Sequence, residues 1–92
     1  MITFKDVTDK LTKIYEEKNH FYGDSFEKTY AQFGLVSAVV RINDKVNRLN
    51  SLTALGGISI PREESIDDTL LDLANYAILT YLIRNKNNDL PC

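Results

Sequence analysis

The amino-acid sequence predicts an all-α protein. Apolar residues recur at three- and four-residue steps along most of the 92 residues, which is the spacing of a helix face. Turn-forming residues separate these periodic segments, at Gly23-Asp24, at Gly34 and at Gly56-Gly57. No segment shows the sustained alternation of apolar and polar residues that indicates a strand. We therefore expect one helical domain over residues 1–92, a compact four-helix bundle of three long helices and one short one.

The first helix is predicted to begin near Phe4 and to run to about Lys18. Thr3 and Asp6 have the spacing of a capping box, in which each side chain bonds the other residue's backbone N–H. Phe4, Val7, Leu11 and Ile14 then follow at helical spacing. Residues 19–25 are predicted to form a turn.

A short second helix is expected over residues 26–33, with Gly34 as its stop. Residues 35–52 predict a third helix with an apolar stripe on one face and charges on the opposite face. The stripe consists of Leu35, Ala38, Val39, Ile42, Val46 and Leu49.

The last helix is expected from Pro61 to about Arg84, because proline fits the first turn of a helix, where its missing N–H costs nothing. Nearly every residue over 70–83 is apolar or aromatic, so we expect protein on most sides of this helix and partial enclosure of its acidic start. Residues 85–92 form a polar tail.

Composition narrows the class of protein. A net charge of −2 gives no overall basic surface for duplex nucleic acid, and the longest apolar run is far shorter than the ~20 residues of a membrane span. The single cysteine, Cys92, cannot form an internal disulfide, which fits a reducing interior. We expect a cytoplasmic protein. Because so short a chain covers a long apolar helix poorly, we also expect a homo-oligomer, a dimer or larger, to complete the bundle.

Four carboxylates near the start of the last helix are candidate metal ligands. Glu64, Asp68 and Asp72 are four residues apart and stack along one side of a helix, with Asp67 on the flank of that strip. Carboxylates on consecutive turns repel unless a cation lies between them, and Mg²⁺ favours carboxylate oxygens together with water and phosphate. We expect these four residues and Asp44 to hold Mg²⁺. The alternative is that they only complement the helix dipole, which explains Glu64 better than Asp72.

A basic strip on the third helix is a candidate phosphate site. Arg41, Lys45 and Arg48 share one face with Asp44, and guanidinium groups bind phosphate oxygens with two parallel hydrogen bonds. The alternatives are that these cations pair with the acidic helix or face water.

The predicted turn before the second helix adds four candidate ligand-binding residues, namely Lys18, Tyr22, Asp24 and Ser25. They offer a cation, a ring, a carboxylate and a hydroxyl to a base or a phosphate. Asp24 or Ser25 could equally cap the second helix. The only histidine, His20, has no partner suited to a zinc site and is expected at the surface.

Three blocks of sequence resemble a known family: residues 18–26, residues 41–49 and, most specifically, residues 64–77. Together they resemble the phage and prophage nucleotide-modification-associated domain, which is related to MazG-like nucleoside triphosphate pyrophosphohydrolases. The resemblance covers about residues 10–84. It implies an oligomeric helical bundle that binds a nucleotide, with Mg²⁺ as a tentative cofactor in a bacterial host cell.

The resemblance leaves the activity open. Glu64 and Asp67 match one acidic motif of the MazG-like enzymes by letter, whereas Glu16-Glu17 lacks the third acid of the other motif, because His20 stands there. The leading hypothesis is a phage-type nucleotide-binding protein, with Mg²⁺-dependent hydrolysis as one version. The alternatives are a non-catalytic protein that sequesters a host signalling nucleotide against host defence, and a helical interaction module.

Overall fold

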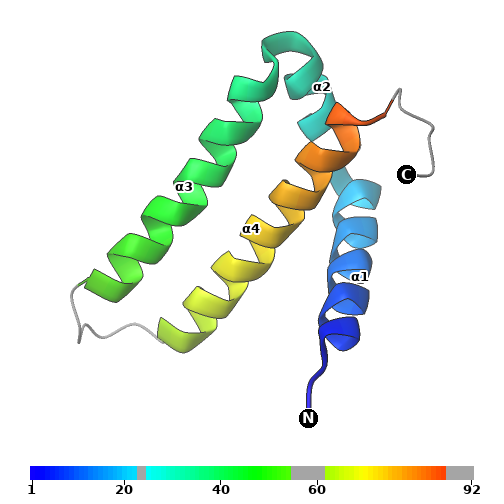
Figure 1. Cartoon of the computed structure of the whole chain (residues 1–92). Coiled ribbons are helices and arrows are strands. Elements are labelled where there is room, and N and C mark those ends of the chain that lie inside the picture. The colour runs from blue at the N-terminus through cyan, green and yellow to red at the C-terminus, as the bar shows by residue number, and fades with distance from the viewer. Residues whose placement is uncertain (23–24, 55–61, 87–92) are drawn as a thin grey trace.

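The computed structural model describes residues 1–22, 25–54 and 62–86, and leaves the side chains of residues 20–22 and 62–65 outside its description. Over these ranges the regular secondary structure is entirely helical, and there is no strand. Its four helices are shown in Figure 1 and are α1 (Phe4–Tyr22), α2 (Ser25–Phe33), α3 (Leu35–Ala54) and α4 (Arg62–Arg84). The predicted all-α class and the number of helices are confirmed.

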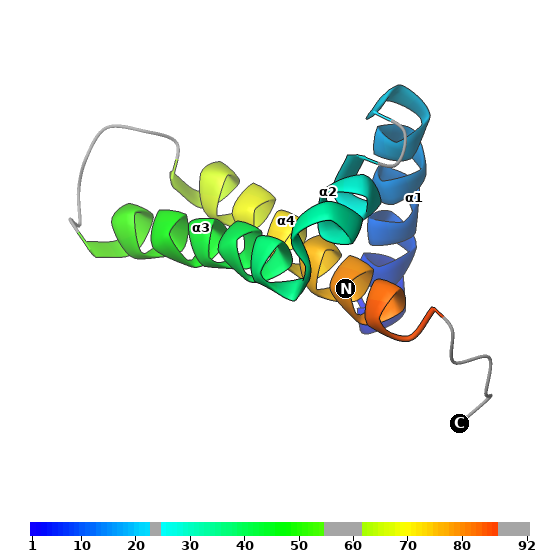
Figure 2. The same cartoon turned by 90° about the horizontal axis from the view of Figure 1, so that it is seen from above.

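The helices α3 and α4 form an antiparallel pair, and this pair is the largest packing contact of the fold. The short helix α2 packs on α3, and α1 packs on α4. The helix α4 therefore lies between α3 and α1, as Figures 1 and 2 show from two directions.

The start of α1 confirms the predicted capping box. The Asp6 backbone N–H donates to the Thr3 hydroxyl at 3.1 Å, and the Thr3 N–H donates to the Asp6 carboxylate at 2.9 Å. The end of α1 corrects the prediction, since the helix continues past Lys18 to Tyr22. No helix-breaking residue stands between them, so nothing in residues 19–22 stops the i to i−4 bonding. The rest of the predicted turn, Gly23-Asp24, lies outside the described residues.

A single residue, Gly34, joins α2 to α3. Its backbone has φ of +81°, the left-handed region that glycine adopts without steric cost. The Gly34 N–H closes the last turn of α2 on the Tyr30 carbonyl, while its own carbonyl accepts from the Ser37 N–H and hydroxyl at the start of α3. The chain thus reverses between two helices without a longer loop.

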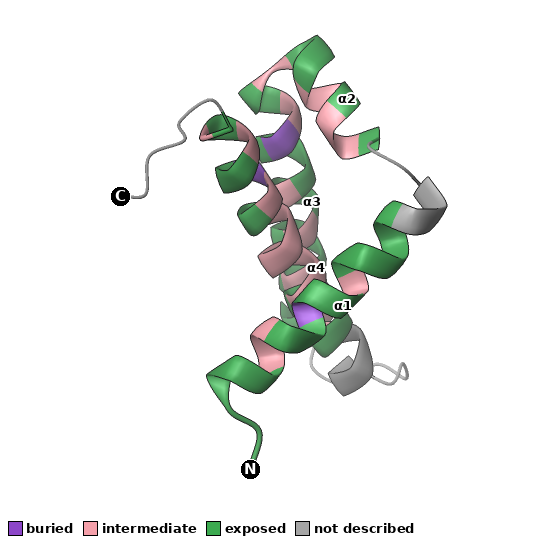
Figure 3. Ribbon diagram, turned by 90° about the vertical axis from the view of Figure 1, so that its right-hand side faces the viewer, coloured by how far each residue is buried: buried purple, intermediate pink, exposed green. Residues whose placement is uncertain are grey.

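The interior of the molecule is small. Among the described residues, the buried apolar side chains are those of Leu11 in α1 and Ala38 in α3. Two threonines of α4, Thr69 and Thr80, are also buried, and Figure 3 shows how few positions share this state. The Thr80 hydroxyl is satisfied by the Tyr76 carbonyl at 2.6 Å.

The expected enclosure of α4 is met only in the middle of the helix, where residues 71–76 are half-buried. Leu70, Tyr81 and Leu82 are 47%, 68% and 56% exposed, because only the sides that meet α3 and α1 are covered. The acidic residues Asp67 and Asp68 are exposed as well.

The orientation of α3 agrees with the prediction only in part. Ala38 of the predicted stripe is buried, and Ile42 and Leu49 are half-buried. Val39 and Val46 were expected in the same stripe, but they are 52% and 38% exposed. The small Ala38 side chain lets α3 approach α4 closely. The valines were assigned inward because both sides of α3 carry apolar residues, and helical spacing alone does not rank the two sides.

No helix in the described part of the chain has the length and apolar character needed to cross a membrane.

We predict that Gly34→Ala lowers the free energy of unfolding by about 1–2 kcal/mol, measured by urea denaturation. An added Cβ would meet nothing within 4 Å, so the loss comes from the left-handed backbone alone. Gly34→Asn is the matched control and should cost less, because asparagine tolerates this conformation. Equal losses in the two variants would contradict this explanation.

Candidate functional site

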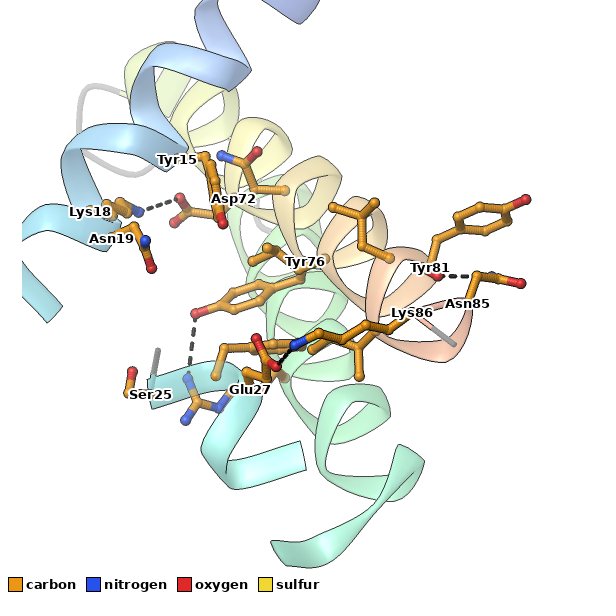
Figure 4. A pocket seen from close by; sticks show the side chains of 16 residues that line it. Tyr15, Lys18, Asn19, Ser25, Glu27, Asp72, Tyr76, Tyr81, Asn85 and Lys86 are labelled. Atoms are coloured by element: carbon orange, nitrogen blue, oxygen red, sulfur yellow. Dashed lines mark hydrogen bonds and ion pairs between the residues drawn. The ribbon is translucent and has the colours of Figure 1, made fainter. Parts of the chain in front are cut away.

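A groove of about 650 Å³ lies where α1, α2 and α4 come together, with one side chain of α3 reaching its edge. Figure 4 shows the side chains that line it. Tyr15 and Lys18 come from α1, Phe26 from α2, Arg41 from α3, and the largest share from α4. The site is therefore built by all four helices.

The carboxylate of Asp72 is the electrostatic centre of this region. It accepts a hydrogen bond from the Lys18 ammonium of α1 at 3.2 Å and lies 3.4 Å from the Lys45 ammonium of α3. Lys45 and Asp72 are about 70% covered, whereas Lys18 is more than half exposed. One negative charge thus holds two positive charges from two other helices.

Tyr76 lies one helical turn after Asp72 and is the central aromatic residue of the groove. Its hydroxyl accepts from the Arg41 guanidinium at 3.5 Å, and the Lys45 ammonium lies 5.9 Å from the centre of its ring. The Phe26 ring of α2 contacts the Tyr76 ring at 5.5 Å between centroids, with 31° between the ring planes. Tyr76 therefore places a π surface beside two cations.

The basic strip of α3 faces α4 along three consecutive contacts. Arg41 reaches Tyr76, Lys45 reaches Asp72, and Arg48 donates from Nε to the Thr69 hydroxyl at 3.1 Å. Residue numbers rise on one helix as they fall on the other, as an antiparallel pair requires. Arg41 lines the groove, and Arg48 lies two turns away from Arg41 and does not line it.

The far end of the groove is closed by an ion pair between Glu27 of α2 and Lys86, which follows α4 (Figure 4). Tyr81 also belongs to the lining, but its ring points away from Tyr76. This end is therefore bounded by a side-chain bridge between α2 and the turn after α4.

The predicted metal ligands are placed as follows. Asp72 lines the groove, and Asp68 is exposed one turn earlier on the same side of α4. Asp44 and Asp67 are exposed, and the Glu64 side chain lies outside the described residues. Within the described ranges, no three acidic, histidine or cysteine side chains gather closely enough to hold a metal ion.

The predicted ligand-binding turn is described only in part. Lys18 of α1 and Ser25 at the start of α2 both line the groove. The side chains of Tyr22 and Asp24 lie outside the described residues, as does that of His20.

Several groove residues were not predicted from the sequence, chiefly Tyr76, Tyr15, Phe26 and Asn75. Tyr76 was counted in the apolar run of α4, and Tyr15, Phe26 and Asn75 were not chosen as candidate site residues. The four-residue step that links Asp68 to Asp72 leads on to Tyr76, so extending the acidic strip by one turn would have found it.

A comparison with protein-family models supplies the class of this protein. The model described as nucleotide modification associated domain 1 matches residues 18–84, which is most of the chain and includes the groove residues from α2, α3 and α4. The chain belongs to this family. No curated protein matches the chain, and no solved structure does.

We predict that Asp72→Asn changes the free energy of unfolding by less than about 1 kcal/mol in urea denaturation. Partly exposed ion pairs contribute little, because water screens the charges and two long side chains lose freedom. Asp67→Asn, at an exposed position five residues earlier on the same helix, is the control. A loss of several kcal/mol in Asp72→Asn alone would show that this carboxylate holds the helices together.

Proposed function

We propose that this chain binds a nucleotide in the groove between α1, α2 and α4. The observation that carries the proposal is the placement of Tyr76 beside Arg41 and Lys45, with Lys18 on the neighbouring helix. A ring offers a stacking surface to a base, and ammonium and guanidinium groups bind phosphate oxygens. Membership of a family associated with nucleotide modification supports the same ligand class.

The charge arrangement supports phosphate as the group that enters. Lys18 and Lys45 both pair with the Asp72 carboxylate, which keeps the two ammonium groups close to each other. A phosphate that displaces this carboxylate from the two ion pairs would therefore meet both ammonium groups. Because these pairs are only partly buried, exchanging the carboxylate for a ligand anion costs little. We also propose that the chain is related to MazG-like proteins and is of phage type. Both properties agree with nucleotide binding.

Sequestration without cleavage is the version that the geometry favours. The negative charge of Asp72 is satisfied by two ammonium groups from α1 and α3, and among the described residues it belongs to no group of three potential metal ligands. A protein that only captures a nucleotide, such as a host signalling nucleotide, needs cations and a ring but no catalytic acid.

Mg²⁺-dependent hydrolysis is the second candidate function. Asp68 and Asp72 lie one turn apart on the same side of α4, and Glu64 comes one turn earlier in the sequence. The described carboxylates do not fit a complete Mg²⁺ site, since Asp44 and Asp67 are exposed and no group of three is formed. Mg²⁺-dependent hydrolysis is therefore tested directly, by an activity assay with nucleotide and Mg²⁺.

We predict that Arg41→Ala weakens nucleotide binding at least tenfold, equivalent to ~1.4 kcal/mol. The measurement is isothermal titration calorimetry with mono-, tri- and cyclic nucleotides. Arg48→Ala is the matched control: it removes the same side chain from the same helix, but at a position that does not line the groove. We expect less than a twofold change there. A larger loss in Arg48→Ala than in Arg41→Ala would move the site along α3, and no binding of any nucleotide would leave a helical interaction module.

We predict that no nucleotide is consumed when the protein is incubated with the same panel and Mg²⁺, with products separated by chromatography. Asp72→Asn should then bind nucleotide several-fold more tightly than wild type in the presence of a chelator, because Lys18 and Lys45 lose the carboxylate that competes with phosphate.

A hydrolase would give the opposite results. Mg²⁺-dependent product that disappears in Asp68→Asn, together with loss of binding in Asp72→Asn, would establish hydrolysis and the acidic strip as the metal site.

A further inference from the structure

Two ion pairs lie at opposite ends of the groove, one on each side of Tyr76. At one end Lys18 of α1 pairs with Asp72, which precedes Tyr76 by one helical turn. At the other end Glu27 of α2 pairs with Lys86, which lies in the turn after α4. Figure 4 shows the Tyr76 ring between these two pairs. The groove therefore offers an ammonium group on each side of one aromatic ring.

The groove is longer than one nucleotide. Its lining follows the chain from Asp72 to Lys86, which corresponds to a helical length of roughly 21 Å. The Lys86 N–H bonds the Ile83 carbonyl at 3.2 Å, so the chain is still turning at this point. A mononucleotide carries phosphate on one side of its sugar only. With its base on Tyr76 it can therefore use the ammonium group at one end of the groove, and the other end is not used.

Both pairs are accessible to a ligand anion. The Lys18 and Lys86 side chains are more than half exposed, and the Glu27 side chain is 41% exposed. Exposed ion pairs contribute little free energy, because water screens the charges and two long side chains lose freedom. A phosphate can therefore take the place of the carboxylate at either end, and the Lys86 end is a second phosphate position of the same kind as the first.

We infer that the groove binds two linked nucleotides, in the form of a 5′-phosphorylated dinucleotide. One phosphate lies at the Lys18 end and the other at the Lys86 end, with a base on the Tyr76 ring between them. Stacking on an aromatic ring accepts any base, so the ligand class is set by the spacing of its phosphates. The inference rests on the proposed function and defines the ligand of the same site more closely.

The distribution of charge limits the length of the ligand. The charged side chains that line the groove are three positive and two negative ones: Lys18, Arg41, Lys86, Glu27 and Asp72. The whole chain, in contrast, has a net charge of −2. A strand that continues beyond the groove meets a net acidic protein, which opposes its further phosphates. A free dinucleotide and the end of a longer strand share the chemistry that the groove recognises, and strand length distinguishes the two sources.

The dinucleotide is tested by isothermal titration calorimetry with AMP, ADP and 5′-phosphorylated diadenylate. ADP carries two phosphates on one nucleoside, so its comparison with diadenylate separates the position of the phosphates from their number. Diadenylate should bind at least tenfold more tightly than AMP or ADP, equivalent to ~1.4 kcal/mol.

Lys86→Ala should lower the ratio of diadenylate affinity to AMP affinity at least fivefold, because it removes the second phosphate position. Lys28→Ala is the matched control, since it removes the same side chain from an exposed position of α2 that does not line the groove. The ratio should stay within twofold of the wild-type value in this control.

A ten-nucleotide adenylate strand tests the source of the ligand. It should bind less than about tenfold more tightly than diadenylate, a gain that its overlapping binding positions alone can supply. A larger gain would show that the groove belongs to a longer single-strand surface, and the assignment to a dinucleotide would be wrong.

The failure of this inference differs from the failure of the proposed function. Equal affinities for ADP and diadenylate, with no response to Lys86→Ala, would overturn the dinucleotide and leave nucleotide binding in place. If no member of the series binds, the proposed function itself is wrong.

Discussion

The packing of α3 against α4 is the constraint on which the rest of the structure depends. Three basic side chains of α3 reach three successive turns of α4, at Thr69, Asp72 and Tyr76. These contacts mark the register of the pair and the side that α3 presents to α4, where Ala38 is buried. The groove takes its position from them, because Tyr76 and Asp72 line it and Arg41 reaches its edge. A shift of one turn along α4 would separate the ring from its cations.

The same packing explains how a chain with an overall negative charge can offer a local site for an anion. Lys18 of α1 and Arg41 of α3 line the groove, and Lys45 of α3, which does not line it, contacts Asp72. Asp72 holds the two lysines together and lowers their mutual repulsion. Because both pairs are partly exposed, each is worth little energy, and a ligand with several negative charges competes well against a single carboxylate. Asp72 therefore organises the cations and opposes the ligand at the same time.

The packing of α3 against α4 leaves several apolar side chains of α3 exposed, among them Val36, Val39 and Val46. A chain of this size has limited means to bury apolar surface, and its interior is correspondingly small, with Leu11 and Ala38 as the buried apolar residues of the described ranges.

The sequence by itself determined the helices, because helical spacing, the Thr3–Asp6 capping box and Gly34 act within one or two turns. The sequence also predicted Lys18, Ser25, Arg41 and Asp72 as candidate ligand- or metal-binding residues, and all four line the groove. Only the tertiary structure decided how far α3 is turned about its predicted stripe, since Ala38 and Ile42 are covered whereas Val39 and Val46 of the same stripe are exposed. It likewise placed Tyr76 among the cations and left Asp67 in solvent, because such juxtapositions arise from long-range packing that no local pattern encodes.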